Sequence, residues 1–244
     1  ILNIDVLSFQ RLAYRIFEET GGAREVLLDD TGKSMVLQKL VQQHRKNLPY
    51  LGNQMNKPGY LDEVKSLISE FMQYDIREEE LQDMLGKTGE DSLLHMKMQD
   101  VGVLYQAFLQ YLEGHYMTGE GVMDALKKAI PFSDKLKKSV LLLDGFTGFT
   151  PVQMNVIREL LNVCDKVLVT VTMDARENPL QMGKPHQLFY MSRKMIHTLS
   201  GLTSNLDDPV LLKDERKGRF GNSTSLDFLE KHLFRYKRSA YEKK

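Results

Sequence analysis

Apolar residues recur with helical spacing near the start of the chain. One stripe falls at positions i, i+3, i+4, i+7 and i+8 and consists of Phe9, Leu12, Ala13, Ile16 and Phe17. This spacing places the stripe on one face of a helix, which the Gly21-Gly22 pair is expected to end. The residues immediately before this helix, 4–8, are predicted to form a short strand.

The pattern stays helical from about residue 23 to residue 130. Two further stripes indicate helices with one buried face each; they are Leu61, Val64, Ile68 and Phe71, and Val101, Leu104, Tyr105, Phe108 and Leu112. Between them, residues 75–100 hold eight acids against three bases and few large apolar residues. That composition predicts a solvated helix face and a connection.

At residue 139 the pattern changes to that of strands. Residues 140–143 form a continuous apolar run, which is typical of a parallel strand buried on both faces. A helix start follows, because Thr150 suits the N-cap, Pro151 the first helical position and Gln153 the end of a capping box. Residues 167–171 are rich in β-branched side chains and predict a second strand. Strand, helix and strand together predict a βαβ unit with parallel strands and a right-handed crossover.

The remainder of the chain is more polar. A helix is expected at about 186–199, and the last segment, 213–244, holds ten Lys/Arg against five Asp/Glu. The pattern as a whole predicts an α/β fold with a large α-helical insertion. Its expected parts are a core of residues 1–22 with 135–200, a helical insertion of residues 23–134, and a basic helical segment of residues 201–244.

Composition limits the possible functions. Formal net charge is zero, so any surface for nucleic acid must be local. Cys164 is the single cysteine, which excludes an internal disulfide framework and a cysteine-rich metal site, and the six histidines form no metal-spaced pair. No apolar run approaches the roughly 20 residues of a membrane span. The chain starts without an initiator Met or a signal peptide, as expected for a piece of a longer protein.

Residues 31–34, Thr-Gly-Lys-Ser, imitate the end of the phosphate-binding pattern G-x-x-x-x-G-K-[ST]. The first glycine of that pattern would stand at position 27, where the chain has Leu27. The Asp29-Asp30 pair would also repel a triphosphate. We therefore expect an ordinary helix start before Met35.

Asp144 directly follows the first predicted strand of the βαβ unit. A carboxylate at the carboxyl end of a central parallel strand lies where open α/β sheets bind ligands and where P-loop proteins hold Mg²⁺. An aspartate that only starts a turn is the alternative, and these residues alone favour neither.

Two segments carry a resemblance to a known family. Residues 144–153, Asp-Gly-Phe-Thr-Gly-Phe-Thr-Pro-Val-Gln, resemble the D-G-F-x-x-F-T-P-x-Q segment of AddB, which pairs with AddA in bacterial AddAB-type helicase–nucleases. That segment is a relative of the D-E-x-Q-D…P-x-Q motif of superfamily 1 helicases of the UvrD/RecB kind. Residues 6–13, Val-Leu-Ser-Phe-Gln-Arg-Leu-Ala, resemble the family's V-L-S-F-x-R-L-A, which takes the place of the helicases' T-F-H-S motif. The resemblance implies a RecA-like, P-loop NTPase-like core.

The resemblance also implies that the motor chemistry has decayed. In active helicases the aspartate helps to hold Mg²⁺ and the next glutamate positions the attacking water, whereas here Gly145 follows Asp144. Residues 171–176 lack the glutamine with which active motors sense the γ-phosphate. No catalytic residue and no cofactor are therefore expected in this chain, where Asp144 would be a vestige of the nucleotide and Mg site. ATP, Mg and an iron–sulfur cluster are expected for the parent protein outside it.

Candidate nucleic-acid contacts follow from the position of the T-F-H-S motif along the single-strand path of the helicases. By position, Ser8, Gln10 and Arg11 are expected to reach phosphates, with amides of the helix start assisting. Phe9 is expected in the core, as part of the apolar stripe. An ordinary exposed arginine remains the alternative for Arg11.

The basic end supplies a second set of candidates, Lys231, Arg235 and Lys237, with Phe234 and Tyr236 available for stacking on bases. A solvated helix face is the alternative, and such runs of charge more often have that role.

The family's function gives the main hypothesis. It is an inactive, motor-derived module of a cytoplasmic ATP-dependent helicase/exonuclease that processes double-strand breaks for recombinational repair. The module would position single-stranded DNA during the search for Chi. The implied partners are an AddA-type helicase–nuclease subunit, in a heterodimer, and single- and double-stranded DNA. Two alternatives stay open: a module that binds ATP without hydrolysing it, and a structural domain that only docks the AddA partner.

Overall fold

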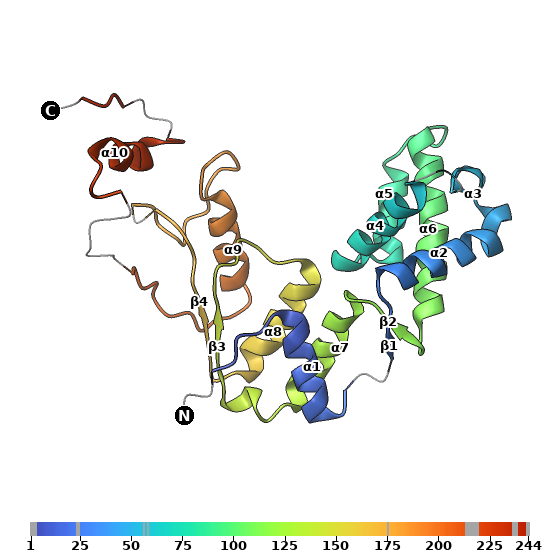
Figure 1. Cartoon of the computed structure of the whole chain (residues 1–244), viewed down its shortest axis with the longest axis horizontal. Helices are drawn as coiled ribbons and strands as arrows, with labels where there is room; N and C mark the ends of the chain where they lie inside the picture. Colours follow the sequence, from blue (N-terminus) through green and yellow to red (C-terminus); the bar gives the residue numbers. More distant parts are fainter. Residues whose placement is uncertain are drawn as a thin grey trace. The chain divides into compact units, whose positions relative to one another are not determined.

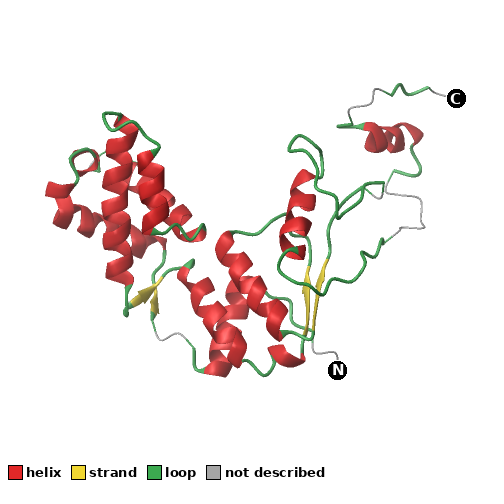
Figure 2. Cartoon of the chain, turned by 180° about the vertical axis from the view of Figure 1, so that it is seen from behind, coloured by secondary structure: helices red, strands yellow, loops and turns green. Residues whose placement is uncertain are grey.

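The computed structural model describes residues 4–22, 25–55, 57, 59–174, 176–212, 220–235 and 239–242. The chain divides into two compact units. The first consists of Ile1–Leu141 and Thr150–Val167, and the second of Leu142–Phe149 and Leu168–Lys244. The described part of the chain contains two small two-stranded sheets among many helices (Figures 1 and 2).

The first unit is largely helical, as the apolar stripes predict. Its α-helices are α1 (Phe9–Thr20), α2 (Asp30–His44), α3 (Leu51–Gln54), α4 (Tyr60–Gln73), α5 (Glu78–Gly86), α6 (Leu93–Leu112), α7 (Gly121–Ala129) and α8 (Pro151–Val163). Short 3-10 helices are η1 (Arg45–Asn47), η2 (Ile130–Phe132) and η3 (Leu136–Lys138). Strands β1 (Val26–Leu27) and β2 (Tyr116–Met117) pair in parallel, with Val26 opposite Tyr116.

Helix α1 begins and ends at the predicted residues. The Ser8 side chain caps it by accepting a hydrogen bond from the Arg11 N–H at 3.3 Å, and Gly21 ends it in the left-handed region with φ 78°. The strand predicted at residues 4–8 is wrong. A strand needs a hydrogen-bonded neighbour, and the strand pairs found in the described part of the chain leave these residues out.

Helices α2 to α6 enclose one hydrophobic core. Leu37, Leu104 and Phe108 are fully buried there, and the rings of Phe71 and Tyr105 meet edge to face at 5.4 Å. Figure 1 shows α4, α5 and α6 beside α2 in this helical body. Two of the three sequence stripes thus form this core.

A second core lies among α1, α7 and α8. Ala13 and Ile16 come from α1, Val122 and Leu126 from α7, and Leu160 from α8. The residues of this core come from both sides of the helical body in the sequence. The chain therefore leaves the second core after α1, builds the helical body, and returns to the second core at β2.

An ion pair joins the helical body to α7. The Lys33 Nζ lies 3.0 Å from both carboxylate oxygens of Glu120 and 3.2 Å from the Ser69 Oγ. Only 7% of the Lys33 side chain and 11% of the Glu120 side chain are exposed. Lys33 belongs to the Thr-Gly-Lys-Ser segment, which begins α2 behind the N-cap Asp29. The predicted helix start is confirmed, and its lysine binds a buried carboxylate.

Asp100, in the middle of α6, caps α3 from a distance. Its buried carboxylate accepts hydrogen bonds from the N–H groups of Tyr50, at 2.9 Å, and Leu51, at 2.6 Å. We expect Asp100→Ala to lower the free energy of unfolding by about 2 kcal/mol, because two N–H groups lose their acceptor. Urea denaturation measures this, with the exposed Asp91→Ala as a control. Equal losses in the two variants would contradict the capping role.

The predicted βαβ unit is confirmed, with strands β3 (Val140–Leu143) and β4 (Lys166–Val169) on either side of α8. The Asp165 N–H donates to the Ser139 carbonyl at 3.1 Å and the Thr170 N–H to the Leu143 carbonyl at 2.9 Å, an order that parallel strands require.

The capping box of α8 forms as predicted, because Thr150 and Gln153 bond reciprocally, at 2.9 and 3.4 Å. Strand β3 is buried on one face only, so the prediction of two buried faces is wrong. Val140 and Leu142 are 58% and 56% exposed, whereas Leu143 is buried.

The second unit contains α9 (Tyr190–Ser200) and α10 (Thr224–His232). Helix α9 matches the helix predicted at 186–199, although it begins four residues later because residues 185–189 form turns. All residues of α10 are exposed or half-exposed. No helix among the described residues is long and apolar enough to cross a bilayer.

Candidate nucleic-acid interface and strand-end carboxylate

The start of α1 presents an exposed polar turn. Ser8, Gln10 and Arg11 are all exposed there, and the first turn of the helix holds no acidic residue. On the other side of α1, Ala13 and Ile16 are buried in the second core. Phe9 is half-buried and packs against that core, which confirms its expected place. The apolar stripe thus fixes the helix so that its polar turn faces solvent.

This turn has the chemistry of an anion site. The N-terminus of a helix carries a partial positive charge and amide donors, and Arg11 adds a full positive charge beside it. One turn further on, Arg15 is paired with Asp5 at 2.9 Å, so its charge is largely balanced. The arrangement suits a phosphate oxygen more than a carboxylate-bearing surface with several charges.

Asp144 lies at the end of β3, as the sequence predicts. Its exposed carboxylate accepts a hydrogen bond from the Thr170 hydroxyl, which directly follows β4. The carboxyl ends of the two parallel strands therefore meet, with one carboxylate between them. In the described residues no group of three or more His, Cys, Asp or Glu side chains could hold a metal ion.

The residue after Asp144 has an unusual backbone. Gly145 has φ 75°, in the left-handed region that costs other residues roughly 1–2 kcal/mol. A glutamate at this position would have to accept that strain or change the turn. The turn itself, and not only the missing side chain, therefore differs from what a water-activating glutamate would require.

Arg235 of the basic end takes part in an internal ion-pair network. Its Nη1 lies 3.1 Å from a Glu177 oxygen, its Nη2 pairs with Asp174, and its guanidinium stacks 5.6 Å above the Phe189 ring. Arg193, which is 8% exposed, lies 3.4 Å from the second Glu177 oxygen. Arg235 thus fastens the segment after α10 to the loop after β4, and its guanidinium is engaged there.

The carboxylate at the centre of this network stays ionised. Hydrogen bonds from the Arg176 guanidinium, together with the charge of Arg235, hold the pKa of Asp174 at about 2. Lys231, on α10, is 59% exposed and pairs with Asp227 one turn away at 2.8 Å. Lys237 and Tyr236 lie outside the described residues.

The candidates therefore form separate groups. Ser8, Gln10 and Arg11 share one turn of the first unit, whereas Lys231 and Arg235 belong to the second unit. Sequence reasoning missed the network around Asp174 because its partners stand 58 and 61 residues from Arg235. No local pattern marks such a pairing.

Comparison with known proteins follows the same residues. The sequence matches the family model described as "ADDB, N-terminal" over residues 1–230. The chain belongs to the AddB N-terminal family. Membership confirms the resemblance carried by residues 6–13 and 144–153.

Curated relatives agree with this assignment. The second (B-type) polypeptide of the ATP-dependent helicase/deoxyribonuclease of Lachnoclostridium phytofermentans is 42% identical over 243 residues, which cover 97% of this chain and 21% of the relative. The proteins of the same name from Desulforamulus reducens and Thermoanaerobacter sp. are 32% and 30% identical, over 95% and 99% of this chain. Within the AddB family, the chain thus spans about a fifth of the length of these relatives.

Proposed function

We propose that this AddB region positions single-stranded DNA inside an ATP-dependent helicase/deoxyribonuclease and does not hydrolyse ATP itself. The observation that carries the proposal is the start of α1, where Ser8, Gln10 and Arg11 present an exposed, acid-free helix end. The relatives are named as one subunit of such an enzyme, which supports the activity of the whole assembly and the existence of a partner subunit. In the family's terms that partner is an AddA-type subunit, and the assembly processes double-strand breaks.

The fold supports descent from a RecA-like motor. The parallel unit β3–α8–β4 with an acid at the end of β3 is the arrangement expected of such a core. The helical body of α2 to α6 then corresponds to the inserted subdomain. Under this assignment the start of α1 lies along the path of the single strand.

The residues of this chain do not fit a complete Mg·ATP site. Lys33 of the Thr-Gly-Lys-Ser segment is held by Glu120, and Gly145 stands where active motors carry glutamate. The proposed mechanism is therefore passive. Contacts to phosphates hold a strand in position while the ATP cycle of the partner moves it, and this holding role suits the search for Chi.

Arg11→Ala is expected to weaken binding of single-stranded DNA by the intact subunit pair about fivefold to tenfold and to lower the salt dependence by about one phosphate contact. Fluorescence anisotropy with labelled oligonucleotides across a salt series measures both quantities. Arg158→Ala, at an exposed position of α8, is the matched control and should leave them unchanged. If Arg11→Ala also leaves them unchanged, the region has a docking role without DNA contact.

A further inference from the structure

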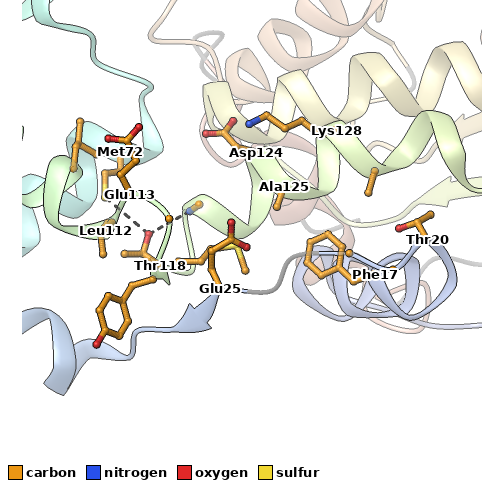
Figure 3. A pocket seen from close by; sticks show the side chains of 18 of the residues that line it. Phe17, Thr20, Glu25, Met72, Leu112, Glu113, Thr118, Asp124, Ala125 and Lys128 are labelled. Carbon is orange, nitrogen blue, oxygen red and sulfur yellow. Dashed lines mark hydrogen bonds between the residues drawn. The ribbon is translucent and has the colours of Figure 1, made fainter.

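An open groove of about 850 Å³ lies in the first unit, beside the junction of its two cores (Figure 3). The end of α1 with Phe17 and Thr20 forms one side, and the end of α6 with Leu112 forms another. Thr118 is fully buried between them, where its hydroxyl accepts from the Gly121 N–H at 3.2 Å and contacts the Met72 sulfur at 3.9 Å. The base of the groove is therefore held by hydrogen bonds.

Apolar side chains along the groove remain in contact with solvent. Phe132 is 73% exposed and Leu109 is 39% exposed, and both line the groove together with Phe17 and Ala125. Exposed apolar surface inside a concavity is typical of an interaction site. Because the groove is open along its length, it suits an extended or helical chain segment better than an enclosed small molecule.

Acidic residues border the same groove. Among its described lining residues, Glu25, Glu113 and Asp124 stand against the single base Lys128. Partial desolvation and the nearby carboxylate of Asp75 raise the pKa of Asp124, which indicates an excess of negative potential. Such a border repels phosphates and attracts cations, so nucleic acid is the wrong occupant.

We propose that this groove docks a peptide segment of a partner protein, with apolar side chains as anchors and Lys or Arg residues on either side of them. The proposal goes beyond DNA positioning and does not depend on it. The candidate DNA contacts lie at the start of α1, and the groove at its end, about 16 Å away along the helix at 1.5 Å per residue. One rigid helix would then connect a DNA contact to a protein contact.

A photo-crosslinking residue tests the occupant in the intact protein within its purified assembly. Phe132→p-benzoylphenylalanine places the probe at the exposed edge of the groove. We expect cross-links to another protein, at a segment that mass spectrometry shows to be apolar and flanked by Lys or Arg. Leu94→p-benzoylphenylalanine is the control, since Leu94 is 57% exposed near the other end of α6. It should not give that cross-link.

Charge reversal tests the acidic border. Glu25→Lys combined with Glu113→Lys should lower the cross-link yield roughly tenfold, because two favourable ion contacts become repulsive. Glu90→Lys combined with Asp91→Lys reverses two exposed charges in the connection before α6 and should leave the yield unchanged.

Four results would overturn the proposal: no cross-link to another protein, a cross-link within the same chain, a cross-link to a second copy, or a yield insensitive to charge reversal at the groove. Single-strand affinity of the Glu25→Lys, Glu113→Lys variant is measured in parallel and should not fall. A loss of peptide docking with DNA affinity intact therefore separates this proposal from the DNA-positioning function.

Discussion

Replacing Glu120 by alanine is expected to lower the free energy of unfolding by about 4 kcal/mol, because the ammonium group of Lys33 is then left buried without its counter-ion. Both side chains are almost inaccessible to water, at 7% and 11% exposure, so solvent cannot replace the lost partner. The Ser69 hydroxyl, 3.2 Å from the Lys33 Nζ, is a neutral acceptor and compensates only in part. Urea denaturation followed by circular dichroism measures the loss.

A double replacement separates the cost of a lone charge from the value of the pair. Lys33→Met with Glu120→Leu should recover most of the stability, because a buried ion pair is often no better than well-packed apolar side chains. Lys87→Ala removes the exposed pair with Asp83 and should cost less than about 1 kcal/mol. If the double variant is as unstable as Glu120→Ala, packing around these side chains and not the charge is decisive.

The same pair predicts a pH dependence of stability. Burial by itself would raise the pKa of Glu120, but hydrogen bonds from Lys33 and the charge of that lysine outweigh it, so the pKa lies below the ordinary 4.5. The unfolded state then binds the proton more tightly than the folded state. The stabilisation is therefore fully present above about pH 4.5 and is lost as the pH falls through the folded pKa. The double variant should lack this acid-dependent part.

Phe108→Ala is expected to cost about 4 kcal/mol, because it removes a fully buried ring from the core of the helical body and leaves a cavity. Leu109→Ala is the matched control, since Leu109 is the next residue of α6 and is 39% exposed. Denaturation in urea gives the difference in stability between the two variants. Similar losses would mean that α6 is held by contacts other than this ring.

Hydrogen exchange then shows how far the damage spreads. Because the two cores are made of different side chains, Phe108→Ala should speed amide exchange in α2 and α6 more than in α7 and α8. Leu160→Ala, in the second core, should give the opposite distribution. Equal acceleration in both cores would show that the first unit opens as one cooperative body.

Features encoded by neighbouring residues could be predicted from the sequence. The stripe from Phe9 to Phe17 gives α1 with its end at Gly21, and Thr150 with Gln153 gives the capped start of α8. In these cases hydrogen bonds and apolar spacing act within a few residues, so the local pattern contains the physical cause.

Features that depend on distant residues could not be predicted. Strands β1 and β2 are two residues long and pair across about 90 residues, so neither has a visible alternation. Lys33 meets Glu120 across 87 residues, and a lysine in an amphipathic helix gives no sign that it is buried. The exposure of Val140 and Leu142 was missed for a related reason, since an apolar run does not tell how many strands lie beside it.

The same division holds for the candidate site. The exposed turn of Ser8, Gln10 and Arg11 follows from the helix that the apolar stripe predicts. The engagement of Arg235 by Asp174 and Glu177 does not, because it depends on how two loops fold.

The pairing of β1 with β2 has a consequence for how this region can change over evolutionary time. The chain enters and leaves the helical body through adjacent strands, with Val26 opposite Tyr116, and neighbouring strands lie only about 4.8 Å apart. Residues between these two points can lengthen, shorten or be exchanged without moving the ends that the second core must hold. The body is therefore attached as a replaceable module at one point, and loop-closure entropy penalises changes in its length only slowly. Relatives can diversify this part of the chain while the core that bears α1 keeps its geometry.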